Sequence, residues 1–279
     1  MDTSTELTNV SSDEISEIKA ELERLNPNFK QRAIEKFTLA ALGSIPWVGG
    51  FLSAAANLKS EEGSLKADLL QTRWLEEHQR KMETLGVTIA AITARFDSLG
   101  DTINERIKSE EYLDVVRKAF RTWDKTDTEE KRKYVANLIS NAAGTSLCSD
   151  DVVRLFIDWL DLYHESHLAV VRCIYKSPGV TRADIWEELY GDFPAENSAE
   201  ADLFRYLIRD LSMGGVIRQA RETTIDGQFL KKRPSQHRSK AMVSSTMESA
   251  FEDSKQYVLT ELGKQFVHYT MNEVVSRLG

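Results

Sequence analysis

Cysteine is scarce in this sequence, with two residues, Cys148 and Cys173, in a chain of 279. Two cysteines without metal-type spacing exclude a disulfide framework or a zinc ribbon, so we expect a reduced intracellular protein. Proline is also rare, with five residues, and 41% of the chain is hydrophobic, which excludes a disordered low-complexity protein. The first residues, MDTSTELTNVSSDEISE, lack the basic start and apolar run of a secretory signal. We therefore expect a cytoplasmic protein, with a peripheral position at the inner membrane as the alternative.

Basic residues are outnumbered by acidic ones. The chain has 36 Lys and Arg against 44 Asp and Glu, and its net charge is −8. A protein whose whole surface binds nucleic acid has a positive net charge, so this composition excludes that class of protein. It leaves room for a local basic patch.

Catalytic motifs are missing as well. The patterns G-x-x-x-x-G-K-[ST], G-x-S-x-G and H-E-x-x-H do not occur. The adjacent acids Glu187 and Glu188 would face different sides of a helix, which does not suit acid–base chemistry by a pair. His164 and His167 have helical spacing but no third ligand nearby, so we expect structural or exposed histidines. We predict no enzyme, no cofactor, no metal and no small-molecule substrate.

One long stretch, Phe37 to Leu58, has no charged residue, although 29% of the chain is charged. A run of about 20 apolar residues suits a helix that crosses a bilayer. Pro46 and the glycines break such a helix, which predicts two short helices, Phe37 to Ile45 and Phe51 to Leu58, joined by a turn from Pro46 to Gly50. The residues assigned to this hairpin are Phe37, Leu42, Ile45, Pro46, Trp47, Val48, Gly49, Gly50 and Phe51.

Two interpretations of this hairpin are open. It is either buried at the centre of a helical bundle or exposed as a membrane-inserting element. Small residues permit close helix contact in both settings, and Trp47 suits a lipid interface as well as a core. The charged remainder of the chain favours the buried hairpin, because short apolar runs are usually core.

A heptad pattern follows. Apolar residues, interrupted by the polar His78, recur at alternating spacings of three and four, which predicts one helix from about Ser64 to Ile107, more than about 60 Å long. Its seam is covered either by other helices of this chain or by a second copy, and the sequence favours neither. The seam residues assigned to self-association are Leu75, Met82, Leu85, Ile89, Ile92, Phe96, Leu99 and Ile103.

Three more amphipathic helices are expected, at 110–123, 128–143 and 149–163. The second is introduced by Asp127 with Glu130, the spacing of a capping box. The fold class is therefore mainly α, with a polar tail at 1–12 and a helical domain at 13–163.

The pattern changes from about His164. Short helices are expected at 167–175, 181–190 and 198–211, then strands at 216–219 and 256–260, and a closing helix from Glu261 to Leu278. The segments LIRDLSMGGVIRQ and YVLTELGKQFVHY resemble the winged-helix superfamily, and the resemblance covers His164 to Met271. It implies a domain at 164–279 that reads DNA or contacts protein.

The expected loop between the strands, at 222–254, is long and basic at its centre. Residues expected to bind nucleic acid or a partner come from this loop and from the helix before it: Arg205, Arg209, Lys231, Lys232, Arg233, Arg238 and Lys240. The loop could contact phosphates, but Glu200, Asp202 and Asp210 on the helix would repel DNA, so protein and DNA partners are about even.

The helical part is similar to uncharacterised bacterial proteins found in settings of abortive infection and phage defence. The matching pieces are Ile45 to Gly50 and Glu129 to Ile139. The first hypothesis is a non-enzymatic effector or adaptor in such a setting. Its helical domain would self-associate or engage a membrane, and its winged helix would sense a partner. The alternative is a dimeric winged-helix regulator that binds DNA.

Overall fold

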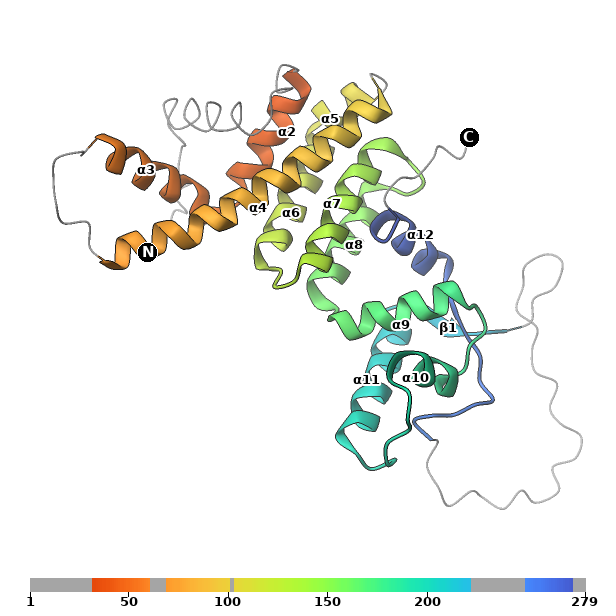
Figure 1. Ribbon diagram of the computed structural model, residues 1–279. Coiled ribbons are helices and arrows are strands. Elements are labelled where there is room, and N and C mark those ends of the chain that lie inside the picture. The colour runs from red at the N-terminus through yellow and green to blue at the C-terminus, as the bar shows by residue number, and fades with distance from the viewer. Residues whose placement is uncertain (1–31, 61–68, 101–102, 222–248, 273–279) are drawn as a thin grey trace, which may run out of the picture. The chain divides into compact units, whose positions relative to one another are not determined.

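The computed structural model describes residues 32–60, 69–100, 103–221 and 249–272 (Figure 1). Within these ranges the fold is mainly α, as predicted, with eleven helices and one antiparallel pair of strands. The chain divides into two compact units. The first runs to Leu162 and takes in the chain again from Tyr269, and the second runs from Tyr163 to His268.

The first unit is a helical bundle with α6 at its centre. Its helices are α2 (Arg32–Gly43), α3 (Pro46–Ser60), α4 (Leu69–Leu99), α5 (Asn104–Lys108), α6 (Glu110–Lys125), α7 (Glu129–Gly144) and α8 (Asp150–Leu162). Helix α6 packs against α2, α5, α7 and α8, and α4 packs along α7. The Phe37 ring meets the Phe96 and Phe120 rings at centroid distances of 5.1 and 6.1 Å, so α2, α4 and α6 share one apolar core.

The uncharged segment forms a corner and not a hairpin. Helix α2 ends at Gly43, α3 begins at Pro46, and the two are bent by 95° at this break. The predicted turn from Pro46 to Gly50 is therefore wrong. Proline is tolerated in the first turn of a helix, because the N–H that it lacks would have no helical partner there.

The long helix is shorter than predicted. Helix α4 has 31 residues and ends at Leu99, which gives a length of about 46 Å. Gly100 ends it with a φ of +73°, in the left-handed region that glycine enters without strain. Residues 64–68, where the predicted helix begins, lie outside the described residues.

The predicted heptad seam, which α4 carries as far as Leu99 and which Ile103 continues just before α5, is buried inside the first unit. Each side chain at Leu75, His78, Met82, Leu85, Ile89, Ile92, Phe96 and Ile103 is at most 9% exposed, and Leu99 is half-buried. Helices α3 and α7 cover this face, as neighbours cover a bundle helix. A second copy is not needed to bury the seam, and self-association stays a prediction.

The cap of α7 lies one residue later than predicted. Thr128 is the N-cap, and its hydroxyl accepts a hydrogen bond from the Lys131 N–H at 3.4 Å. Asp127 is exposed and does not cap the helix. A threonine with extended backbone satisfies the same free donors as an aspartate would, so sequence alone could not choose between the two neighbours.

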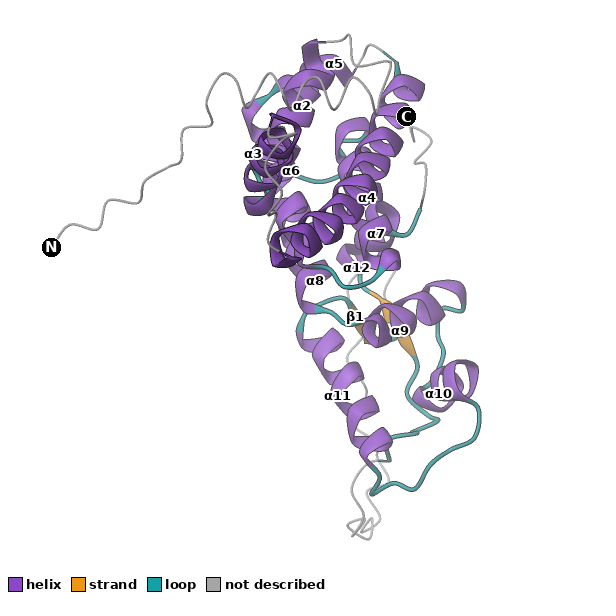
Figure 2. Ribbon diagram, turned by 60° about the vertical axis from the view of Figure 1, so that its left-hand side comes forward, coloured by secondary structure: helices purple, strands orange, loops and turns teal. Residues whose placement is uncertain are grey.

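The second unit contains three helices, two strands and the start of a fourth helix. These are α9 (Glu165–Lys176), α10 (Arg182–Tyr190), α11 (Ala199–Met213), β1 (Ile217–Gln219), β2 (Tyr257–Leu259) and α12 (Glu261–Thr270). Strands β1 and β2 pair antiparallel, with Arg218 opposite Val258, and β2 lies against α9 (Figure 2). A capping box begins α10, where Thr181 and Asp184 satisfy each other's backbone N–H groups.

The end of α12 belongs to the first unit. The buried Asn137 and Asn141 of α7 donate to the backbone oxygens of Thr270 at 2.8 Å and Tyr269 at 2.9 Å. The last carbonyl groups of a helix receive no hydrogen bond from its regular backbone pattern, and α7 supplies donors to these two. The sequence prediction placed all of 164–279 in one domain, and the structure differs from Tyr269 onward.

Candidate functional site

Helix α11 carries apolar side chains on two opposite faces. Its inner face is closed into the second unit, with Phe204, Leu207, Ile208 and Leu211 almost fully buried. Its outer face leaves Leu203 53%, Tyr206 54% and Met213 74% exposed. Single exposed apolar residues are ordinary on protein surfaces, but three large ones along one helix indicate a contact surface.

Charged groups surround this outer face. Glu200 and Asp202 are exposed in the first turn of α11, where the helix dipole favours negative charge. Asp210 lies further along the helix, with its Oδ2 3.2 Å from Nε2 of the buried His167. Of the two predicted binding arginines, Arg209 is exposed, whereas Arg205 is engaged in ion pairs. The face therefore combines apolar surface with carboxylates at its start and with the exposed Arg209 between Tyr206 and Met213.

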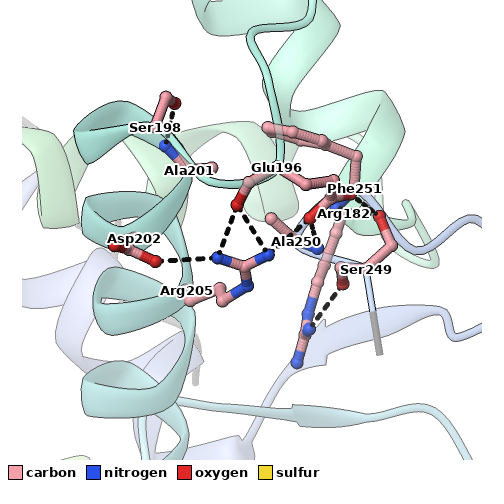
Figure 3. A network of polar contacts seen from close by, with 9 residues as sticks. All are labelled: Arg182, Glu196, Ser198, Ala201, Asp202, Arg205, Ser249, Ala250 and Phe251. Carbon is pink, nitrogen blue, oxygen red and sulfur yellow. Dashed lines mark hydrogen bonds and ion pairs between the residues drawn. The ribbon is translucent and has the colours of Figure 1, made fainter. Parts of the chain in front are cut away.

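A polar network fixes the N-terminal end of α11 (Figure 3). The Glu196 carboxylate accepts hydrogen bonds from the Ala250 N–H at 3.0 Å and from the Ser249 hydroxyl, and it pairs with the Arg205 guanidinium. The Arg205 guanidinium also donates to Asp202 at 2.8 Å. The N–H of Ala250, the Ser249 hydroxyl and Arg205 favour the charged carboxylate and lower the pKa of Glu196 below its ordinary value.

Arg182 adds a second connection to the same place. Its Nε donates to the Tyr257 hydroxyl at 3.1 Å, and its guanidinium lies 5.6 Å from the centre of that ring. Its Nη1 also donates to the Ser249 backbone oxygen at 3.4 Å. The chain from Ser249 is therefore held against α10, β2 and the loop before α11.

Aromatic contacts also hold the chain that follows Ser249. The Phe251 ring contacts the rings of Trp186, Phe193 and Phe204 at centroid distances of 5.0, 5.2 and 6.1 Å. Trp186 and Phe204 are buried, whereas half of Phe193 is exposed. Phe251 thus fastens the chain to α10 and α11 through apolar contacts, independently of the Glu196 network.

His164 and His167, the histidine pair noted in the sequence, contribute to the start of α9 and to its packing. His167 is buried, and its Nδ1 accepts a hydrogen bond from the His164 N–H at 3.2 Å, which caps the start of α9. The ring of His167 also stacks on Tyr163 at 5.1 Å. Within the described residues, no group of three or more His, Cys, Asp or Glu side chains is placed to hold a metal ion.

The corner of the first unit is a second place where polar and aromatic groups converge. Trp47 Nε1 donates to the Asp124 carboxylate at 2.6 Å, and its ring meets the His78 ring edge-on at 5.1 Å. His78 in turn stacks on Trp74 at 4.0 Å. The sequence analysis missed Trp74 and Asp124, because their proximity to Trp47 depends on how α3, α4 and α6 pack.

The predicted hairpin residues divide by burial. Phe37, Leu42, Ile45 and Val48 are buried, Trp47 and Phe51 are half-buried, and Pro46, Gly49 and Gly50 are exposed. No single described helix is long and apolar enough to span a membrane, but the bent pair 33–43 and 46–56 meets the length and composition requirement together. The inner half of the corner is therefore core, and α3 carries its exposed part.

The remaining predicted contact residues fall outside the described residues. These are Lys231, Lys232, Arg233, Arg238 and Lys240. Their two neighbouring described positions are Arg221, shortly after β1, and Ser249, in the network of Figure 3.

Both cysteines are free thiols. Cys173 is buried and donates to Glu188 at 3.0 Å, and burial, reinforced by that carboxylate, raises the pKa of its thiol to about 12. Burial also raises the pKa of Cys148. A thiol that stays protonated is a poor nucleophile and a poor metal ligand.

Comparisons of the chain with protein-family models, with curated proteins and with solved structures find no match. The function is therefore argued from the geometry of these surfaces.

Proposed function

We propose that this chain is a non-enzymatic adaptor whose second unit is a winged-helix-type module that binds a protein partner. The outer face of α11 carries this proposal, because Leu203, Tyr206 and Met213 are exposed there beside acidic groups. The order of three helices, two antiparallel strands and a closing helix supports the module type. The defence setting rests on the sequence resemblance alone.

The same face argues against DNA as the partner. A recognition helix needs free Arg, Lys, Asn or Gln side chains for base edges and phosphates. On α11, Arg205 pairs with Glu196 and Asp202, so part of its charge is already neutralised, and Arg209 is left as the exposed arginine of the helix. Glu200 and Asp202 would approach the phosphates and repel them.

Site-specific photo-cross-linking in cells tests the proposal. A photoreactive amino acid replaces Tyr206 on α11 and, as the matched control, Lys264, which is exposed on α12. The adaptor function predicts a discrete cross-linked protein from position 206 that is absent from position 264. Failure of position 206 to give a discrete product, with the chain folded and expressed, would contradict it.

A DNA-binding measurement distinguishes the proposed adaptor from the alternative, a DNA-binding regulator. Fluorescence anisotropy with the full chain and a labelled duplex is followed from low to physiological salt. We expect no binding. Affinity that falls steeply as salt rises would identify a DNA-binding regulator instead, because such a slope reports counterion release from phosphates.

Membrane engagement by the first unit is the second candidate. It is favoured by the bent pair of apolar helices, whose α3 part is partly exposed. Dye release from anionic lipid vesicles tests it, with Gly50→Glu as the matched variant because nothing lies within 4 Å of a Cβ there. Release by the wild type that the variant lacks would support this candidate, and an inactive wild type would remove it.

A further inference from the structure

The exposed face of α11 has the spacing of a helix-pairing seam. Ala199, Leu203, Tyr206, Asp210 and Met213 follow one another at intervals of four, three, four and three residues, which places them on one side of the helix. Helix α4 has the same kind of seam, and there the bundle buries it. On α11 the large apolar members remain more than half exposed. This stripe has the pattern of a helix contact, and no helix among the described residues covers it.

The stripe is held in place before any partner arrives. The inner face of α11 is closed in the core of the second unit, and the Glu196 network anchors its first turns. The Tyr206 ring meets the buried His167 ring edge-on at 5.9 Å, which restricts its orientation. A preformed surface loses little conformational entropy on binding, so modest contacts suffice for measurable affinity.

The charges at the amino-terminal end of the stripe select the partner. Glu200 and Asp202 border its beginning, where Arg205 is paired with Glu196 and Asp202, so that carboxylates outnumber the guanidinium at that end. Asp210 stands in the stripe itself, and the exposed Arg209 lies beside its far half. A binding helix would gain from lysine or arginine beside its apolar seam, as flanking charges do in coiled coils. A second copy of α11 would bring the same acids to the contact.

We infer that the α11 stripe docks an amphipathic helix whose apolar seam is flanked by basic residues, supplied by a protein partner. The inference rests on the proposed adaptor function and names the chemistry of its partner. The 15 residues of α11 span about 22 Å, so the docked helix would have about four turns.

Binding of designed peptides to the full chain tests the inference. The probes are a labelled helical peptide of leucine and lysine of about 15 residues, a peptide with glutamate in place of lysine, and a scrambled leucine–lysine peptide. Fluorescence anisotropy should show binding of the ordered leucine–lysine peptide and of neither control. Equal binding of the scrambled peptide would overturn the inference, because charge alone would then explain it.

Surface variants locate the contact. The pair Leu203→Ser with Met213→Ser should weaken peptide binding about tenfold or more, because the apolar anchors are removed without touching the core. Val87→Ser is the matched control, since Val87 is a 71% exposed apolar residue on α4. Glu200→Lys should weaken binding as well. Equal affinity of the wild type and the α11 variants would overturn the inference.

Two further readouts keep the alternatives apart. Light scattering that shows a dimer lost with Leu203→Ser and Met213→Ser would assign the stripe to a second copy and overturn the inference. If a partner is cross-linked from position 206 but the peptide does not bind, the adaptor function is retained and the inference of a basic helix as the partner is rejected. Failure of both measurements would reject the adaptor function itself.

Discussion

The Glu196 carboxylate joins the start of α11 to a segment that lies 53 and 54 residues further along the chain. It lies in the loop before α11, accepts from Ser249 and Ala250 and pairs with Arg205. Isolated surface ion pairs contribute little, but a carboxylate that also accepts a backbone N–H is held more firmly. This residue positions the start of α11 and the end of the segment that returns to β2.

Acid should therefore loosen the second unit. The pKa of Glu196 is lowered from 4.5, so its contribution to stability is complete above that value and is lost as pH falls through the lower folded value. We expect thermal unfolding followed by circular dichroism to show a drop in Tm below pH 4.5 that is smaller in Glu196→Gln. Glu187→Gln, at an exposed carboxylate of α10, is the control. An unchanged pH dependence in Glu196→Gln would contradict this assignment.

Thiol reactivity should be low in the native protein. Burial raises the pKa of Cys173 to about 12 and also raises the pKa of Cys148, so few thiolates exist at neutral pH. Mass spectrometry after iodoacetamide treatment should find both cysteines largely unmodified in the folded chain and fully modified in denaturant. Rapid native alkylation of Cys173 would show that this part of α9 opens.

At the scale of elements, α12 and the turn just before β1 approach so closely that a glycine is required. A Cβ built on Gly263 would lie 2.1 Å from the Val216 backbone oxygen. Thr260, just before α12, accepts the Gly263 N–H at 2.9 Å and donates its own hydroxyl to the Gly215 oxygen at 2.6 Å. The closing helix therefore docks on the turn before β1 through backbone contact.

Gly263→Ala should destabilise the second unit by about 1–3 kcal/mol, because neither backbone can move away without breaking these bonds. Urea unfolding monitored by circular dichroism measures the change. Gly50→Ala is the matched control. It lies in α3 with nothing within 4 Å of a Cβ, and alanine there should be neutral or stabilising by about 0.5–1 kcal/mol. Similar effects of both variants would contradict the close approach.

The corner between α2 and α3 depends on a contact from α6. Asp124→Ala removes the acceptor for Trp47 Nε1, and hydrogen bonds to charged groups contribute about 1.5–3 kcal/mol. We expect faster amide hydrogen exchange in α3 with little change in α7. Equal exchange in α3 of the variant and the wild type would mean that the apolar contacts of Val48 and Leu52 hold α3 by themselves.

At the scale of the whole molecule, the chain returns to its first unit at the end of α12. The buried Asn141 amide donates to the backbone oxygens of Tyr269 and Asn272, and Asn137 donates to that of Thr270. Buried amides in a helical core are costly unless paired, and here both pair with the last turn of another helix.

Asn141→Ala should lower the unfolding free energy of the first unit by about 1–3 kcal/mol, because the carbonyl oxygens of Tyr269 and Asn272 lose the Asn141 amide as a donor. Thermal unfolding of the full chain measures the loss, and Ser53→Ala on the partly exposed face of α3 serves as the control. A neutral Asn141→Ala would show that other contacts of the α12 end carry this docking.

Local patterns of the sequence were sufficient for the helix class and most helix positions. The period of Leu85, Ile89 and Ile92 predicted a helix, and its side chains are buried. The ends were harder, because Asp127 and Thr128 are both good caps and Pro46 begins a helix as readily as it breaks one. For the candidate site, Arg205 was selected by its charge, but its pairing with Glu196 was not visible.

The sequence by itself determined that this chain is helical, that its helices are amphipathic with apolar stripes, and that residues 37–58 carry no charge. Such features depend on neighbours within one or two helical turns. The tertiary structure decided which stripe is covered. It buries the seam of α4 and exposes that of α11, and it brings Glu196, Arg205 and Ser249 together. Burial and ion pairing depend on residues far apart in the chain, so the exposed α11 stripe emerged only from the packing of the elements.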